Sequence, residues 1–248
     1  MGSSPSYNFF GPYHTIFICL SIVISLLSGC DPQPTFLPDD PHGIQPYTHN
    51  QAYWQYQGQP ILLLGGSVDD NLFQSSNLEE HLDQLHSAGG NYVRNTMSGR
   101  NQEIGNVWPF SQDPQTGLYD LNRFDNRYWQ RFENFLEQTA KRQIIVQIEV
   151  WATWDYYQQF WLHNPFNPQN NSNYTTQQSH LATRYDIHAA TAGNPFFHSV
   201  PLDKDIPLVL QYQKHFVDKM LSYTLRYDHV LYCISNETTT SPTWGQSW

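Results

Sequence analysis

Apolar residues recur at helical spacing in three stretches of the chain. In residues 77–88, Leu78, Leu82 and Leu85 follow one another at intervals of four and three, and two glycines then supply a stop. A longer stretch, about residues 125–142, places aromatic and aliphatic residues on one face in the same way. The third predicted helix begins with Asp205 as its N-cap and Pro207 in its first turn.

Short apolar runs that are typical of buried strands lie between these helices. They cover residues 60–64, 91–95, 144–150 and 230–234. The first run follows a predicted hairpin around Gln57-Gly58-Gln59 and is expected to be the first buried strand, ending at Gly65-Gly66. Because strands alternate with helices, the pattern predicts an α/β fold with a parallel sheet and crossover helices.

One connection is unusually long. About fifty residues, from Trp151 to Asp203, separate the third strand from the last helix, and they are rich in Trp, Tyr, Phe, Asn and His. Loops of this length are uncommon in compact domains and usually carry function.

The N-terminus contains an apolar run, residues 16–27, which is too short to span a bilayer and is typical of a secretory signal. It ends in Leu27-Ser28-Gly29-Cys30, which resembles the bacterial lipobox. The resemblance implies a signal peptide over residues 1–29 and a lipid on Cys30, with an extracytoplasmic, membrane-anchored protein. No Lys or Arg precedes the run, which departs from the usual signal. A plain cleaved signal or a tethering helix is the alternative.

Residues 30–50 are acidic and rich in proline, which predicts a tether, and the folded domain is expected over residues 51–248. If Cys19 leaves with the signal and Cys30 carries lipid, Cys233 is the one remaining thiol. The domain then contains no disulfide and depends on its core for stability.

Charge and motif content exclude several classes of function. The chain has 12 Lys and Arg against 22 Asp and Glu, for a net charge of -10, and no basic cluster suits a phosphate backbone, so nucleic acid is not an expected partner. Eleven histidines occur, but no His-Glu-x-x-His or paired His and Cys spacing is present. We therefore expect no metal and no other cofactor. The sequence also lacks a Gly-x-Ser-x-Gly elbow and a phosphate-binding glycine loop.

The fourth strand runs directly into Ser235-Asn236-Glu237. This arrangement, with Arg94 on the second strand and Trp151 at the end of the third, resembles the retaining glycoside hydrolases of clan A, over most of residues 53–248. The resemblance implies a (β/α)8 TIM barrel. It also implies that Glu237 is the catalytic acid/base, that Asn236 binds the sugar 2-hydroxyl, and that Arg94 supports the nucleophile.

Glycoside cleavage needs two carboxylic groups, because one protonates the leaving oxygen while the other meets the positive charge that develops on the sugar carbon. Each of these roles has a structural alternative. Glu237 is then an exposed loop carboxylate, Arg94 forms an interior salt bridge, and Asn236 caps a helix or is a glycosylation site. Glu149 shares a strand face with Gln147 and Trp151, and an interior carboxylate is the favoured interpretation of it.

The aromatic residues of the long loop offer planar surfaces for the apolar faces of sugars. The candidates for stacking are Trp151, Trp154, Tyr156, Tyr157 and Trp161. Packing of these rings against one another is the alternative interpretation.

Four strands are counted where such a barrel has eight, and the clan's nucleophile lies on the seventh. We therefore expect a barrel truncated after about the fourth strand, with exposed apolar faces and no turnover by this chain alone. The leading hypothesis is a retaining hydrolase of β-linked oligo- or polysaccharides. The rivals are a non-catalytic glycan-binding surface lipoprotein and a purely structural envelope protein.

Overall fold

The computed structural model describes residues 42–99, 105–187, 193–236 and 241–248. These belong to one compact unit, residues 39–248, which is separate from residues 1–38. The predicted signal peptide and Cys30 therefore lie outside the described residues, as does Glu237. In the part of the chain that is described, no helix is long and apolar enough to cross a membrane.

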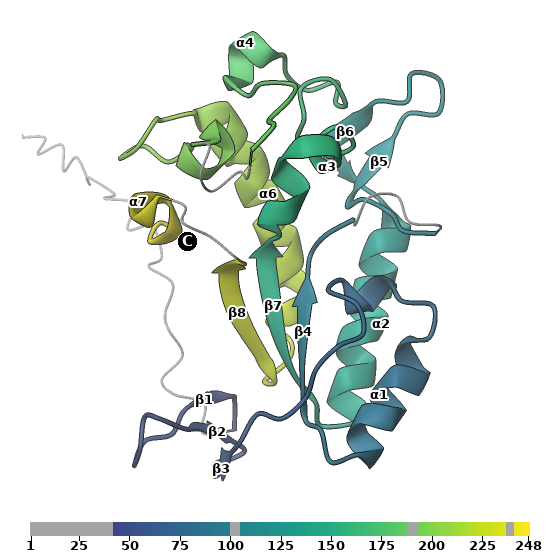
Figure 1. Ribbon diagram of the computed structural model, residues 1–248, viewed down its shortest axis with the longest axis vertical. Coiled ribbons are helices and arrows are strands. Elements are labelled where there is room, and N and C mark those ends of the chain that lie inside the picture. Colours follow the sequence, from purple (N-terminus) through teal and green to yellow (C-terminus); the bar gives the residue numbers. More distant parts are fainter. Residues whose placement is uncertain (1–41, 100–104, 188–192, 237–240) are drawn as a thin grey trace, which may run out of the picture. The chain divides into compact units, whose positions relative to one another are not determined.

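A parallel sheet of three strands forms the centre of the unit (Figure 1). The strands are β4 (Tyr92–Thr96), β7 (Ile145–Trp151) and β8 (Val230–Ser235), in the order β4-β7-β8. Arg94 lies beside Gln147, and Glu149 lies beside both Thr96 and Cys233. The predicted second, third and fourth strands and their parallel order are confirmed.

Helix α1 (Leu78–Ser87) precedes β4, α2 (Asn126–Lys141) lies between β4 and β7, and α6 (Pro207–Thr224) lies between β7 and β8. Leu78 and Leu82 of α1 are buried, as their spacing predicts. The N-cap of α2 is Asp125, whose carboxylate accepts a hydrogen bond from Arg127 N and so satisfies one of the free amides of the first turn. The cap of α6 differs from the prediction, since Ile206 occupies that position without a side-chain bond.

The strand register divides the sheet into two faces, because side chains alternate along a strand and paired residues share a side. One face carries Val93, Val146 and Ile148, which are fully buried together with the aromatic residues of α2. Tyr232 shares this face, and its hydroxyl donates to Thr224 of α6. The other face, which we call the polar face, carries Tyr92, Arg94, Gln147, Glu149 and Cys233, together with the apolar Ile145 and Leu231.

A small antiparallel sheet precedes the parallel one. It contains β1 (Gln45–Pro46), β2 (Trp54–Tyr56) and β3 (Gln59–Ile61), and the predicted hairpin turns at Gln57 and Gly58, which both have positive φ. Ile44 N also donates to Asp228 O, just before β8. Backbone hydrogen bonds therefore join the segment around β1 to this small sheet and to the turn before β8.

The first predicted strand is only partly present. Its run of leucines continues past β3, but Leu62 and Leu64 are 62% and 53% exposed. A single parallel bridge, Gly65 with Tyr92, joins the segment to the sheet, supported by a bond from Asn91 N to Leu64 O. The expectation of a buried first strand is wrong because no described element packs over these leucines to cover them.

The long loop folds into short helical turns held by buried asparagine side chains. These turns are η3 (Thr153–Tyr156), α3 (Gln158–Trp161), α4 (Thr176–Ser179) and η4 (Pro195–His198). Asn167 is fully buried and donates to the carbonyls of Trp161 and Thr183. Asn194 likewise donates to Tyr156 O. Such bonds satisfy loop backbone groups that packing removes from water.

Three further elements follow β4 and β8. An antiparallel pair, β5 (Phe110–Gln112) and β6 (Tyr119–Phe124), lies between β4 and α2. A last turn, α7 (Pro242–Gly245), follows β8.

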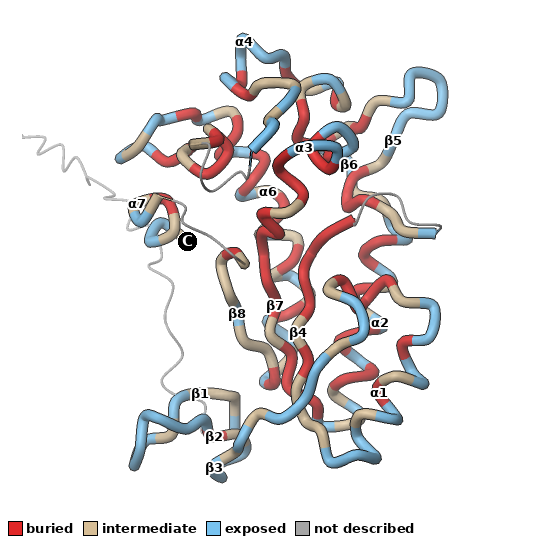
Figure 2. Tube along the Cα trace, in the orientation of Figure 1, coloured by how far each residue is buried: buried red, intermediate tan, exposed pale blue. Residues whose placement is uncertain are grey.

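The described residues contain helices and parallel strands but no closed barrel. Burial is greatest along β4 and β7 and lower along β8, the outer strand (Figure 2). An apolar groove of about 180 Å³ lies beside β8 and α6, lined by Tyr232, Ile234, Met220 and Trp248 among others. The described parallel sheet is therefore open, and this groove lies at its outer strand β8.

Candidate active site

Charged side chains gather on the polar face of the sheet around Arg94. Its Nη2 atom donates to Asp70 Oδ1 at 2.5 Å, and its Nε lies 3.5 Å from Glu149 Oε1. The side chains of Arg94 and Asp70 are each 40% exposed, whereas that of Glu149 is 4% exposed. One guanidinium therefore lies between a buried carboxylate and a solvent-facing one.

Asp70 was not among the residues that the sequence singled out. It lies in the loop that follows the Gly65 bridge, and its carbonyl accepts a hydrogen bond from Thr96 N at 2.6 Å. The same loop is held at Phe73, whose N–H donates to Asn95 Oδ1. These contacts fix the Asp70 backbone against the end of β4, which brings its carboxylate to Arg94.

The charges of Arg94 and Glu149 shift the pKa values of Tyr92 and Cys233 on the same face. The Tyr92 hydroxyl donates to Gln147 Oε1 at 2.9 Å, and burial raises its pKa, with a further increase from Glu149. Burial also raises the pKa of the Cys233 thiol, and Glu149 raises it further while Arg94 lowers it. The Cys233 thiol, which is half-buried, donates to Ser235 O.

Asn236 is the last described residue before Glu237 and is tied to the end of the third strand. Its N–H donates to Trp151 O, and its Oδ1 accepts from Thr153 N at 3.0 Å. The Thr153 hydroxyl donates to Asn236 O at 2.8 Å. These bonds hold the chain at the carboxyl end of β8 against the carboxyl end of β7, at the edge where parallel α/β proteins place their chemistry.

Trp151 lies in the core. It is 2% exposed and packs against a ring of aromatic side chains, with centroid separations of 5.2 to 6.3 Å. The surrounding residues are Phe166, Phe196, Phe216, Trp244 and Trp248. Its ring faces are therefore covered by protein, so direct stacking of Trp151 on a sugar does not fit this packing.

The other loop aromatics divide in the same way. Tyr156, Tyr157 and Trp161 are buried, which agrees with the alternative that these rings pack on one another. Trp154 is partly buried and lies against Tyr157 and Phe160, with a centroid separation of 4.5 Å from Phe160. Of the five candidates for stacking, Trp154 is the one that retains solvent-facing surface.

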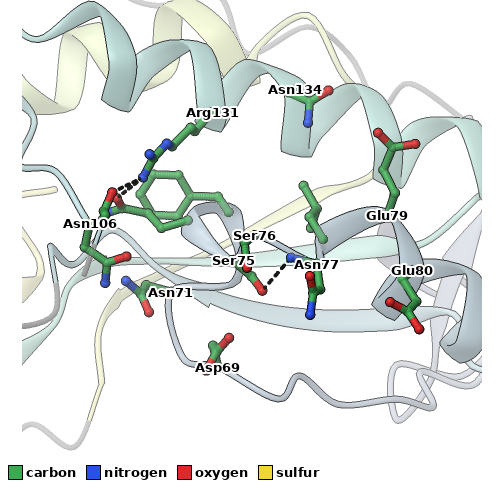
Figure 3. Close-up of a pocket in the computed structure, with 14 residues that line it drawn as sticks. Asp69, Asn71, Ser75, Ser76, Asn77, Glu79, Glu80, Asn106, Arg131 and Asn134 are labelled. Atoms are coloured by element: carbon green, nitrogen blue, oxygen red, sulfur yellow. Dashed lines mark hydrogen bonds between the residues drawn. The ribbon is translucent and has the colours of Figure 1, made fainter. Parts of the chain in front are cut away.

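A pocket of about 630 Å³ lies apart from Arg94, Glu149 and Asn236, none of which lines it (Figure 3). It lies over the start of α1 and the side of α2, and amide, hydroxyl and carboxylate groups line it. Arg131 at its wall already donates to Gly105 O and Gln74 Oε1. The described residues contain no group of three His, Cys, Asp or Glu side chains that is arranged to hold a metal ion.

No family model matches the chain, and no curated protein matches it in sequence. The solved structures that it resembles include glycoside hydrolases. A family 5 mannosidase from Rhizomucor miehei has 13% identity and a TM-score of 0.49, over 84% of this chain and 52% of that chain. A β-mannanase from the blue mussel Mytilus edulis has 16% identity and a TM-score of 0.41, over 75% and 43%.

Endo-glycoceramidase II from Rhodococcus sp. has 16% identity and a TM-score of 0.40, over 77% of this chain and 42% of that chain. The chain spans between a third and about half of the length of such structures.

Proposed function

We propose that the chain forms the amino-terminal part of a retaining glycoside hydrolase that acts on β-linked oligo- or polysaccharides. The observation that carries this proposal is the parallel pairing of β7 with β8 up to Trp151 and Ser235. This pairing brings Asn236, the residue before Glu237, to the carboxyl edge of the sheet. Arg94 and Glu149 lie on the polar face of the same sheet.

In this proposal Glu237 donates a proton to the leaving glycosidic oxygen and Asn236 binds the sugar 2-hydroxyl. Arg94 holds the second carboxylate of the reaction in its ionised form. Glu149, which is buried and lies beside Arg94, acts as an interior carboxylate. Trp154 offers a ring face to the sugar, while Trp151 anchors the end of β7 in the aromatic core.

Two carboxylic groups, Glu237 and the second carboxylate, suffice for both steps of a retaining reaction. The second carboxylate attacks the sugar carbon as the protonated acid releases the leaving group, and the ionised acid then removes a proton from water that cleaves the glycosyl intermediate. The identity of the second carboxylate is not assigned to any described residue.

Replacement of the acid/base tests the proposal. In the full-length protein, Glu237→Ala lowers kcat/KM for an unactivated β-glycoside by about 100-fold or more, because proton transfer from a positioned acid contributes that much. With an activated aryl glycoside the first step needs no acid, so azide restores turnover and yields a glycosyl azide with retained configuration. Glu80→Ala, a change of an exposed glutamate on α1, serves as the matched control.

Hydrolysis that is unchanged by Glu237→Ala removes this residue from the mechanism. If glycan binding persists in a protein without hydrolase activity, the non-catalytic glycan-binding lipoprotein takes the place of the enzyme.

We also propose that Cys30 carries a lipid that anchors the protein outside the cytoplasm. Its support is the sequence Leu27-Ser28-Gly29-Cys30 after the apolar run. Cys30→Ser blocks lipid attachment, so the protein moves from the membrane fraction to the soluble fraction on ultracentrifugation. A variant that stays in the membrane fraction contradicts the anchor, and Cys19→Ser provides the control.

A further inference from the structure

Arg94 is shared unequally between its two carboxylates. The contact with Asp70 is a short, charge-assisted hydrogen bond at 2.5 Å, whereas Glu149 is 3.5 Å from the nearer guanidinium nitrogen. Two carboxylates against one guanidinium leave a formal charge of about -1 on this cluster when all three are ionised. The position of the cation between the two anions therefore decides the local field.

The backbone around Asp70 is held by hydrogen bonds to the end of β4. The Asp70 carbonyl is bonded to Thr96 N, and the next residue, Asn71, donates to Ser98 O. Both partners lie at or just after the end of β4, the strand that carries Arg94 itself. The loop and the strand thus form one rigid support, which sets the distance between Asp70 and Arg94.

We propose that Asp70 is a positioning residue, which draws the Arg94 guanidinium toward the open side of the sheet and limits its pairing with Glu149. The proposal rests on the proposed function, in which Arg94 faces the second carboxylate of the reaction. Without Asp70, the guanidinium closes on Glu149 and moves deeper into the polar face, toward Cys233.

Cys233 provides a native probe of this movement. It pairs in register with Glu149 on the neighbouring strand, and Arg94 lowers its pKa while Glu149 raises it. The charged and titratable groups on this face are Tyr92 and Arg94 from β4, Glu149 from β7 and Asp70 from the preceding loop. The thiolate fraction of Cys233 therefore reports on where the guanidinium lies.

The experiment measures the rate of Cys233 alkylation against pH in the full chain, with peptide mapping to separate Cys233 from Cys19 and Cys30. Asp70→Asn is expected to lower the pKa of Cys233 by about half a unit, which raises the alkylation rate about threefold below that pKa. Asp69→Asn is the matched control, because it removes the same charge from the neighbouring, exposed position.

A double-mutant cycle separates positioning from the direct effect of the lost charge. If Asp70 acts through Arg94, Asp70→Asn shifts the profile in the wild-type background and has no effect in an Arg94→Gln background. An equal shift in both backgrounds, or no shift in either, overturns the proposal. Asp70→Glu keeps the carboxylate, so its Cys233 alkylation profile is expected to match that of the wild-type protein. If Asp70→Glu displaces the profile as far as Asp70→Asn does, the proposal is also contradicted.

The cycle is independent of the proposed chemistry, since it reads a thiol and not turnover. If Glu237→Ala shows that Glu237 is not catalytic while the cycle succeeds, Arg94 is held by Asp70 but serves another purpose. If the cycle fails while Glu237 proves catalytic, the proposed hydrolase function is supported and the positioning role of Asp70 is rejected.

Discussion

At the scale of single residues, a buried histidine links the fold to pH. His229 is 1% exposed, immediately before β8, and its Nε2 lies 3.1 Å from Thr139 Oγ1 of α2. Burial lowers its pKa from 6.5 to about 4, because the charged imidazolium loses its hydration there. The folded chain thus holds His229 neutral at pH values where the unfolded chain already binds a proton.

This difference predicts a loss of stability in mild acid. Above pH 6.5 His229 is neutral in both states, so its contribution is complete, and it falls as the pH drops from 6.5 to about 4. The slope is roughly 1.4 kcal/mol per pH unit and the total about 3 kcal/mol. Urea unfolding at several pH values measures it, and subtracting the profile of His229→Gln removes the contribution of the carboxylates. Parallel profiles for the two proteins contradict the prediction.

Sequence alone could place some site residues but not their partners. The two-residue period of a strand puts Gln147 and Glu149 on one side, and the parallel register places Arg94 beside Gln147, where its Nε lies 3.5 Å from Glu149 Oε1. The sequence does not predict the role of Asp70, because that role depends on its contact with the distant Arg94, for which no spacing pattern exists. The covering of Trp151 by five aromatic residues likewise depends on contacts with distant segments, which no local spacing reveals.

At the scale of elements, periodicity predicts the helices and central strands well. The buried stripes of α1 and α2 and the apolar runs of β4, β7 and β8 appear within one or two residues of their expected bounds. These elements lie in the core, where burial of apolar area favours the same conformation as the local pattern.

The elements that were misjudged depend on their neighbours. An apolar run predicts a buried strand at residues 60–64 only if something covers it, and Leu62 and Leu64 are exposed. The pair β5 and β6 is not among the predicted strands. A signal for β6 is nevertheless present, since Tyr119-Asp120-Leu121-Asn122 alternates between apolar and polar residues as a half-buried strand does. The long loop gains its order from buried asparagines, whose bonds to distant carbonyls no local pattern reveals.

At the scale of the whole molecule, the parallel sheet has one face covered by helices and one polar face. The covered face supplies the apolar core, while the polar face holds Arg94, Asp70 and Glu149. The strands end together at Trp151 and Ser235, so the residues that follow them meet at one edge. In the proposed function, Glu237 follows Asn236 at this edge and acts as the proton donor.

Affinity labelling with an N-bromoacetyl glycosylamine tests this claim most directly, because the reagent alkylates a carboxylate beside the glycosidic oxygen of a bound sugar. The full-length protein is treated with the gluco- and manno-configured reagents, with and without a competing oligosaccharide, and the labelled peptide is sequenced by mass spectrometry. The account predicts a label on Glu237 that the oligosaccharide suppresses. A protected label on Glu149 or Asp70, with Glu237 unmodified, contradicts it.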